Sequence, residues 1–388
     1  MRPNKGLLLA RIFQRVNMTF RRIPTLLILP LALVLVAESA SAQEQSQVVL
    51  PPPSGPSSVG TTVWHWIDTA RLDEVTPDRN DVREIMAQAW YPATTDSAAQ
   101  TAPYAPLYPN LSHVRSWSYP SARIVATDKP LPVLVIVPGR GVARHFYTAI
   151  AEDLASHGYF VLAIDSPHSG RVVYPDGRSI PPAPRYRIPF EVLTGPYEQV
   201  DEFFQEAADL GAADVAFALE RLAEINRKDP ARRFTGRLDL SRLGAFGHSL
   251  GGRIAGSAVA ADSRFIAYAS MEGVPPRAAR KGGMDAGVLM MVSSALPEMA
   301  QPNIRDIIPN RRNDVYVVTL EGFGHNSVSD LPLLEPGEYA YEVEPLVALN
   351  TIRSLLRFFF DEYVRQSPGA TLAAGDTERV RLEVFEKP

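Results

Sequence analysis

The stretch Gly247-His248-Ser249-Leu250-Gly251-Gly252 (residues 247–252) decides how the rest of this chain is interpreted. It contains the pattern G-x-S-x-G, which is typical of a sharp turn that raises a serine between a strand and a helix. The apolar run 243–246 before it predicts a buried strand, and the alanine-rich run 254–261 after it predicts a helix. A chain with 25 glycines can meet the pattern by chance, so the alternative is a tight turn with an idle hydroxyl. The strand–turn–helix context favours a nucleophile at Ser249.

The composition is that of a globular protein with one sizeable core. The chain has 388 residues, of which 46% are hydrophobic and 21% charged. Its formal net charge is −4 and its body contains no basic block, so nucleic acid is not an expected partner. It has no cysteine, which excludes disulfides, thiolate metal sites and a cysteine nucleophile.

The first 42 residues have the layout of a secretory signal peptide. Six basic residues precede an apolar run, 23–37, and Ala40-Ser41-Ala42 follows as a cleavage site of the A-x-A type. Translation starting at Met18 would shorten the long charged leader. The alternative is an uncleaved membrane anchor, but the run is shorter than the roughly 20 apolar residues that a spanning helix needs. We expect cleavage after Ala42, an exported protein with no membrane span, and a mature net charge of −9.

The next part of the chain predicts an N-terminal strand pair. Residues 43–60 are rich in Pro, Ser and Gln and are expected to form a flexible leader. The segments 61–75 and 83–91 alternate as strands do, and we expect them to pair antiparallel. The proline- and tyrosine-rich segment 94–129 has no clear period and is expected to be irregular.

The following segments predict a parallel α/β sheet. Leu131–Val137 reads LPVLVIV, a continuous β-branched run typical of a strand buried on both faces. A helix is expected at 146–157 and another buried strand at 159–164, which together form a βαβ unit. The proline-rich loop 166–196 is long enough to overhang a site.

The remaining elements complete the prediction. A helix is expected at 198–228, strands at 265–271, 288–292 and 315–320, and a closing helix at 346–364. The fold class is therefore α/β: a mostly parallel central sheet with helices on both faces and an antiparallel N-terminal strand pair. We expect one catalytic domain at 61–366 and a polar C-terminal tail at 367–388.

A serine hydroxyl needs a base, and that base needs an acid to orient it. The turn described above is called a nucleophile elbow. In folds that carry a catalytic serine on such an elbow, the chain order is serine, acid, histidine. His325 follows the last predicted strand and is the one histidine of seven downstream of Ser249. Glu272 ends the strand after the elbow helix, at the edge where such sites form, and is the preferred acid. Glu298 and Asp306 remain alternatives, and Glu272 would then be a structural ion-pair partner.

The oxyanion of an ester reaction needs backbone N–H donors. We expect them at Leu250, after the nucleophile, and at Arg140, in the loop after the first parallel strand. The Arg140 side chain could contact the substrate or be solvated. His145, His168 and Phe323 are candidate substrate-binding residues. No metal or cofactor is expected, because no ligand motif such as HExxH occurs and residues 139–144 lack a dinucleotide fingerprint.

Several segments resemble the α/β-hydrolase superfamily and, within it, the platelet-activating factor acetylhydrolase group and its dienelactone-hydrolase-like relatives. They are Pro138-Gly139-Arg140-Gly141, Asp153-Leu154-Ala155-Ser156-His157-Gly158, the elbow 247–252, Met271-Glu272 and Gly324-His325-Asn326. In that group the acid follows the strand after the elbow helix, which supports Glu272. Two residues depart from the group: glutamate replaces the usual aspartate at 272, and Pro138 replaces a common histidine.

The resemblance implies an α/β-hydrolase fold and hydrolysis of esters with short or modified acyl chains. We therefore expect a secreted serine carboxylic-ester hydrolase that forms an acyl-enzyme on Ser249. The alternatives are a polyester- or cutinase-type hydrolase, a peptidase with the same triad, or an inactive hydrolase fold that serves as a binding protein. The expected partner is a small-molecule or lipid-like ester, and the sequence does not indicate an oligomeric state.

Overall fold

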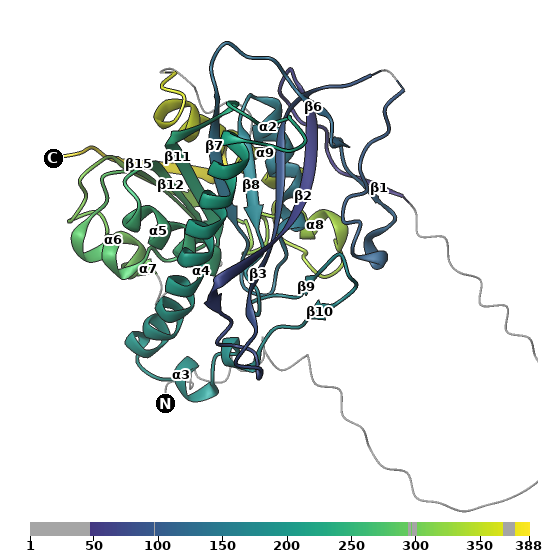
Figure 1. The fold of residues 1–388 in the computed structure, drawn as a ribbon. Helices are drawn as coiled ribbons and strands as arrows, with labels where there is room; N and C mark the ends of the chain where they lie inside the picture. Colours follow the sequence, from purple (N-terminus) through teal and green to yellow (C-terminus); the bar gives the residue numbers. More distant parts are fainter. Residues whose placement is uncertain (1–46, 97, 294–295, 297–300, 368–376) are drawn as a thin grey trace, which may run out of the picture. The chain divides into compact units, whose positions relative to one another are not determined.

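The computed structural model describes residues 47–96, 98–293, 296, 301–367 and 377–388 (Figure 1). All of them belong to one compact unit, which runs from Gln45 to Pro388. The predicted signal peptide, 1–42, and the start of the predicted leader lie outside the described residues. Within these ranges, no helix combines the length and the apolar character needed to cross a bilayer.

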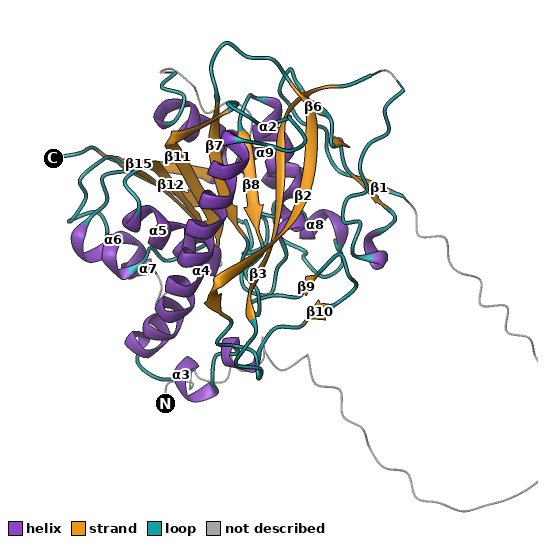
Figure 2. Ribbon diagram, viewed as in Figure 1, coloured by secondary structure: helices purple, strands orange, loops and turns teal. Residues whose placement is uncertain are grey.

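An eleven-stranded sheet forms the centre of this unit (Figure 2). Its strands lie in the order β15-β14-β13-β12-β11-β7-β8-β3-β2-β5, and β6 pairs with β3. The six strands from β14 to β8 run parallel, whereas β15, β3 and β2 are antiparallel to their inner neighbours. The bounds in this sheet are β2 Ser58–Leu72, β3 Val82–Thr94, β5 Ser118–Pro120, β6 Arg123–Ile124, β7 Leu131–Val137, β8 Phe160–Ile164, β11 Leu238–His248, β12 Phe265–Met271, β13 Gly287–Ser293, β14 Val315–Leu320 and β15 Val380–Phe385.

Helices cover both faces of the sheet, as predicted. Along β7, Val133 and Val135 face one apolar core, and Leu134 and Ile136 face the other; all four are fully buried. The first core is closed by α4 (Tyr197–Arg227) and α5 (Leu250–Ala261), and the second by α2 (Thr148–Ser156) and α9 (Pro345–Tyr363). Figure 1 shows α4 crossing the sheet on the side opposite α2 and α9. Burial on both faces explains why the central strands are continuous apolar runs.

Short elements complete the unit. They are β1 Val48–Val49, β4 Val114–Arg115, β9 Val172–Val173, β10 Ser179–Ile180, α3 Phe190–Leu193, α6 Arg277–Gly282, α7 Gln301–Arg305, α8 Leu331–Leu334 and the 3₁₀ turns η2 Pro109–Leu111, η3 Arg144–Tyr147, η4 Pro184–Tyr186 and η5 Thr377–Arg379. The segment 94–129, expected to be irregular, thus contains η2 and three short strands. The helix expected at 146–157 is divided into η3 and α2.

The described part of the predicted flexible leader packs against the unit. Val48 and Val49 pair with β4, and the side chain of Leu50 is buried. The guanidinium of Arg353 on α9 donates hydrogen bonds of 3.2 Å to the carbonyls of Pro51 and Pro52. Proline lacks a backbone N–H but keeps its carbonyl, so a buried arginine can hold a proline-rich segment that forms no ladder of its own.

The predicted polar tail also differs from the structure. Its last residues form β15, which pairs antiparallel with β14 at the edge of the sheet. The strand alternates Val380, Leu382 and Val384 with charged residues, the period-2 pattern of a half-exposed strand. This pattern is only six residues long, and the residues with which it pairs lie 60 to 70 positions earlier in the chain.

A buried glutamate joins α2 to the start of β5. Glu152 is fully buried, and its Oε1 accepts hydrogen bonds from the amides of Trp117 (2.9 Å) and Ser118 (2.7 Å) and from the Ser118 hydroxyl (2.6 Å). Its Oε2 has no partner among the described residues. Burial raises the pKa of Glu152 to about 7, although the hydrogen bonds from Ser118 act in the opposite direction.

Replacing Glu152 with glutamine should therefore change how stability depends on pH. Because the folded-state pKa is raised above the unfolded value of about 4.3, the contribution of Glu152 to stability is present at low pH and is lost as pH rises through about 7. Glu152→Gln should raise the free energy of unfolding at pH 8 relative to pH 5 by roughly 1–3 kcal/mol compared with the unsubstituted protein. Urea unfolding at the two pH values measures this. Glu220→Gln, at an exposed position of α4, should show no such difference, and an equal response of both variants would contradict the assignment.

Candidate active site

The turn between β11 and α5 holds Ser249 in an unusual backbone conformation. Its φ is 55° and its ψ is −120°, a region that side-chain-bearing residues rarely occupy. The amide of Ser249 donates a 2.8 Å hydrogen bond to the carbonyl of Met271, the last residue of β12. Strand, strained serine and helix thus follow one another as the elbow pattern predicts, and the strain singles out this serine as a functional candidate.

The elbow presses closely against the end of β7. A Cβ atom at Gly251 would lie 2.2 Å from the carbonyl oxygen of Val137 and 2.3 Å from that of Pro138. A Cβ atom at Gly139 would lie 2.8 Å from Nδ1 of His248. Only glycine allows this approach, so the loop after β7 and the first turn of α5 lie side by side.

Two backbone amides at this junction stand out because they are unpartnered. Among the described residues, neither the amide of Arg140 nor that of Leu250 has a hydrogen-bond partner. The amides beside Arg140 are both engaged: Gly139 donates to the hydroxyl of Tyr147 (3.0 Å) and Gly141 donates to the carbonyl of Ser169 (2.9 Å). These contacts fix the loop while leaving unpartnered the two amides that the sequence predicts as oxyanion donors.

The Arg140 side chain extends toward the segment after β10. Its guanidinium donates a 3.4 Å hydrogen bond to the carbonyl of Tyr186 in η4. Although the residue is exposed, partial desolvation by its neighbours lowers the pKa of Arg140. The hydrogen bond to Tyr186 shows that the Arg140 side chain is not fully solvated, and it does not test the alternative of a substrate contact.

The preferred acid, Glu272, follows β12 directly. Its backbone also has a positive φ, 58°, and its amide donates to the carbonyl of Met291 in β13 at 2.9 Å. The side chain is buried; Oε1 accepts from the amide of Ser293 and Oε2 accepts from the Ser293 hydroxyl at 2.8 Å. The carboxylate is therefore held by the neighbouring strand and keeps one orientation.

His325 comes from the loop after β14 and meets this carboxylate. Its Nδ1 lies 3.5 Å from Oε2 of Glu272, and 43% of the imidazole side chain is exposed. Its ring centroid lies 4.6 Å from that of His248, inside the elbow. The structure thus brings Glu272 and His325 together beside Ser249, although among the described residues no hydrogen bond joins Ser249 Oγ to His325.

Within the described residues, the alternative acid Asp306 does not lie at this position. Asp306 is exposed, and its carboxylate lies 4.0 Å from Nη1 of Arg280 on α6. Glu298 lies outside the described residues. Of the described candidates, only Glu272 contacts His325.

Tyr147 links the elbow to the loop after β7, a role that the sequence analysis did not predict. Its hydroxyl accepts from the amide of Gly139 and lies 2.7 Å from Nδ1 of His248. Burial, and then the charge of His325, lowers the pKa of His248 well below its ordinary value. His248 is therefore neutral and serves packing. Tyr147 and His248 are 101 positions apart in the sequence, so no motif or spacing predicts their contact.

The three candidate substrate-binding residues have different surroundings. His168 is buried and its Nε2 lies 2.8 Å from the Asp73 carboxylate, which also meets Arg83. Phe323 is buried in the core on the α2 side. His145 is buried beside a separate cavity. In the described part of the chain, no three His, Cys, Asp or Glu residues come together as a metal site would require.

Comparison with known proteins agrees with this architecture. Residues 43–174 match the family model of platelet-activating factor acetylhydrolase, isoform II. A platelet-activating factor acetylhydrolase from Cavia porcellus is 24% identical over 172 residues, which are 41% of this chain and 38% of that protein. The match thus spans well under half the length of this relative. It covers neither the whole chain nor the whole relative.

A solved structure extends the similarity to most of the chain. A ferulic acid esterase from Streptomyces cinnamoneus superposes with a TM-score of 0.73 at 25% sequence identity, covering 88% of this chain and 100% of that one. These matches confirm the resemblance drawn from the sequence, and the fold is the α/β-hydrolase fold. The family model ends before Ser249, Glu272 and His325, so the roles of these residues remain predictions.

The close approach at Gly251 predicts a large cost for a single methyl group. Gly251→Ala should lower the free energy of unfolding by more than about 3 kcal/mol, because the new Cβ would overlap two backbone carbonyls that cannot move independently of β7. Gly282→Ala is the matched control, since nothing lies within 4 Å of a Cβ there, and it should change stability by less than about 1 kcal/mol. Urea denaturation compares the two, and similar stabilities would refute the close packing of the elbow.

Proposed function

We propose that this protein is a serine hydrolase that cleaves carboxylic esters through an acyl-enzyme on Ser249. One observation carries the proposal. A strained serine stands at the sheet edge where two unpartnered amides and a Glu272–His325 pair meet. Acyl transfer needs these parts together: a nucleophile, a base with its orienting acid, and donors for the oxyanion.

The first half of the reaction forms the acyl-enzyme. Ser249 Oγ attacks the ester carbonyl carbon while His325 Nε2 takes the hydroxyl proton. The amides of Arg140 and Leu250 bind the negative charge on the carbonyl oxygen, which is greatest in the tetrahedral intermediate. The C–O bond to the alcohol then breaks, and His325 returns the proton to the departing oxygen.

The second half regenerates the enzyme. His325 takes a proton from water as the water oxygen attacks the acyl carbon, and the acid leaves as Ser249 recovers its proton. Glu272 stays ionised, orients Nδ1 of His325 and stabilises the imidazolium. The 3.5 Å separation is longer than a hydrogen bond, and such contacts commonly tighten when substrate binds.

The substrate class proposed is a small or lipid-like ester with a short or modified acyl chain. The names of the two similar proteins support the ester bond more than any one acyl group: one is a platelet-activating factor acetylhydrolase and the other a ferulic acid esterase. A polyester- or cutinase-type hydrolase and a peptidase would use the same residues. The proximity of Glu272 and His325 to the elbow disfavours an inactive binding protein.

The proposal includes export from the cytoplasm. It rests on the charged leader, the apolar run and the A-x-A site within residues 1–42. The expected mature chain is acidic, and it has no cysteine to be oxidised outside the cell.

Ser249→Ala should abolish hydrolysis of p-nitrophenyl acetate, lowering kcat/KM by at least about 10³-fold, because no other group can form the acyl-enzyme. The rates of hydrolysis of p-nitrophenyl esters from acetyl to dodecanoyl measure this loss and define the preferred acyl-chain length. A fluorophosphonate probe should label the unsubstituted protein once, at Ser249. Ser257→Ala, on the same helix but away from the turn, should retain labelling. Labelling of a different residue would contradict the assignment of Ser249 as the nucleophile.

Glu272→Gln should lower kcat by roughly 10²–10⁴-fold, because the amide keeps an acceptor for Ser293 but loses the charge that stabilises the imidazolium. Asp306→Asn and Glu298→Gln are the matched tests of the alternative acids and should stay within about twofold of the parent. Thermal unfolding shows whether Glu272→Gln keeps its structure. A rate close to the parent for this variant, with a large loss in either of the others, would move the acid there.

A further inference from the structure

One edge of the central sheet has backbone groups without a partner. β15 is the last strand at this end, and among the described residues it pairs only with β14 (Figure 1). The amide of Glu321 donates a 2.9 Å hydrogen bond to the carbonyl of Arg379, which sets the alternation along this ladder. The N–H and C=O groups of Val380, Leu382 and Val384 therefore point away from β14, and no described residue hydrogen-bonds them.

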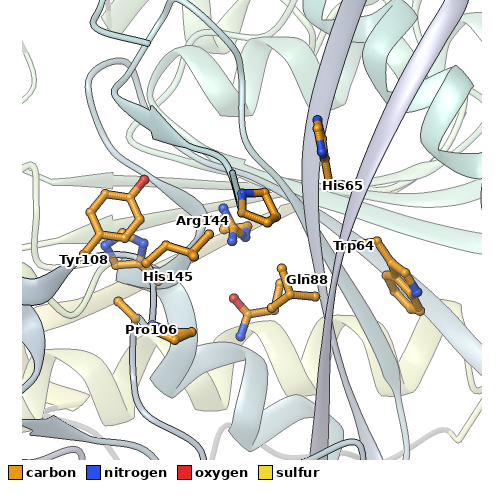
Figure 3. Close-up of a pocket in the computed structure, with 11 residues that line it drawn as sticks. Trp64, His65, Gln88, Pro106, Tyr108, Arg144 and His145 are labelled. Carbon is orange, nitrogen blue, oxygen red and sulfur yellow. The ribbon is translucent and has the colours of Figure 1, made fainter. Parts of the chain in front are cut away.

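The opposite edge of the sheet is protected, and this one is not. At the far end, β5 is only three residues long and ends with Pro120, which has no N–H to donate. The pocket in Figure 3, which Trp64 and Gln88 of β2 and β3 help to line, also belongs to that end of the sheet. β15, in contrast, has six residues, no proline and a continuous register without a bulge. Proteins usually blunt such an edge, because it is a template for another strand.

The side chains of β15 are complementary to themselves in the antiparallel direction. In a pair of copies related by a two-fold axis through Leu382, Val380 lies opposite Val384 of the second copy. In the same pair, Arg381 lies opposite Glu383 of the second copy. An axis through Arg381 or through Glu383 would instead place two like charges opposite each other, which is unfavourable. The sequence thus favours one register, and that register is symmetric.

The exposed groups of this strand match what such a pairing needs. Val384 is 48% exposed, and Val380 of a second copy would cover it. Arg381 is exposed and has no ion-pair partner in the part of the chain that the structure describes. Glu383 pairs with Arg305 on α7, and its two carboxylate oxygens can accept from a second arginine as well.

We propose that two copies of this protein pair through β15, antiparallel and about a two-fold axis at Leu382, so that their central sheets become continuous. About six backbone hydrogen bonds form between the outward-facing groups of the two strands. Arg381 and Glu383 pair across one face, and the valines and leucines meet on the other. The proposal does not depend on the proposed hydrolase activity, because no residue of the proposed triad lies on β15.

Analytical ultracentrifugation of the purified protein tests the pairing. The protein should change from monomer to dimer with a Kd on the order of 10–100 µM, because one short strand makes a smaller contact than a standard interface. Arg381→Glu and Glu383→Arg should each weaken the dimer at least tenfold, since each places like charges opposite each other. Lys129→Glu, the same change of charge at an exposed lysine before β7, is the control and should dimerise as the parent does.

Mixing the two charge variants tests the register. In a mixed pair, each glutamate of the Arg381→Glu protein faces an arginine of the Glu383→Arg protein. An equimolar mixture should therefore form a heterodimer with about the affinity of the parent, although each variant alone is monomeric. A variant in which β15 had only become loose would not regain affinity on mixing, and such a result contradicts the proposed register.

Cysteine cross-linking locates the axis, because the chain has no cysteine of its own. Leu382→Cys places two thiols opposite each other and should form a disulfide-linked dimer under mild oxidation. Val384 is the more exposed position, but its thiols would lie about 13 Å apart along the strands. Val384→Cys should therefore cross-link at least tenfold more slowly.

Three results overturn the proposal. One is a parent protein that stays monomeric up to about 1 mM. Another is a dimer that neither charge variant weakens, because it would use a different surface. The third is equal cross-linking rates for Leu382→Cys and Val384→Cys, which would indicate random collision rather than a fixed axis.

Discussion

The structure depends on the contact between the first turn of α5 and the end of β7, where two backbones meet without a side chain between them. Gly251 permits it, because any Cβ there would overlap the carbonyls of Val137 and Pro138. The contact brings the amide after Ser249 beside the loop that carries the amide of Arg140. Without it, the two donors would belong to unrelated parts of the fold, and no shared oxyanion site could form.

Strand order then determines what else reaches the serine. β12 is the neighbour of β11, and the bond from the Ser249 amide to Met271 joins the two strand ends. Glu272 follows immediately, so the proposed acid is positioned by the same backbone that holds the proposed nucleophile. His325 comes from the loop after β14, two strands further along the sheet, and its side chain is 43% exposed against 1% for that of Glu272. The proposed acid is thus held rigidly, and the proposed base is accessible, as a proton carrier requires.

Much of this arrangement was predictable from the sequence because local patterns decide it. The strands at 265–271 and 315–320 have their predicted bounds, and Ser249, Glu272 and His325 follow from motif and chain order. The missed features all depend on pairing between distant segments. Arg353 holds Pro51 and Pro52, β15 returns to β14, and Tyr147 meets His248, yet none of these partners is close in the sequence. Periodicity records which face of an element is buried, but not what buries it.

The segment 139–147 shows how one short stretch can combine structural and ligand-facing groups. The amide of Gly139 is bound by the Tyr147 hydroxyl at the end of the segment, and the amides of Gly141 and Arg144 are bound by Ser169 and Asp165; these bonds fix the segment. Within this fixed stretch, the amide of Arg140 and the ring of His145 are polar groups for which the described residues provide no partner. Because the hydrogen bonds on both sides of Arg140 hold the backbone in place, its amide would already be oriented before a substrate binds, as a donor for the proposed oxyanion must be.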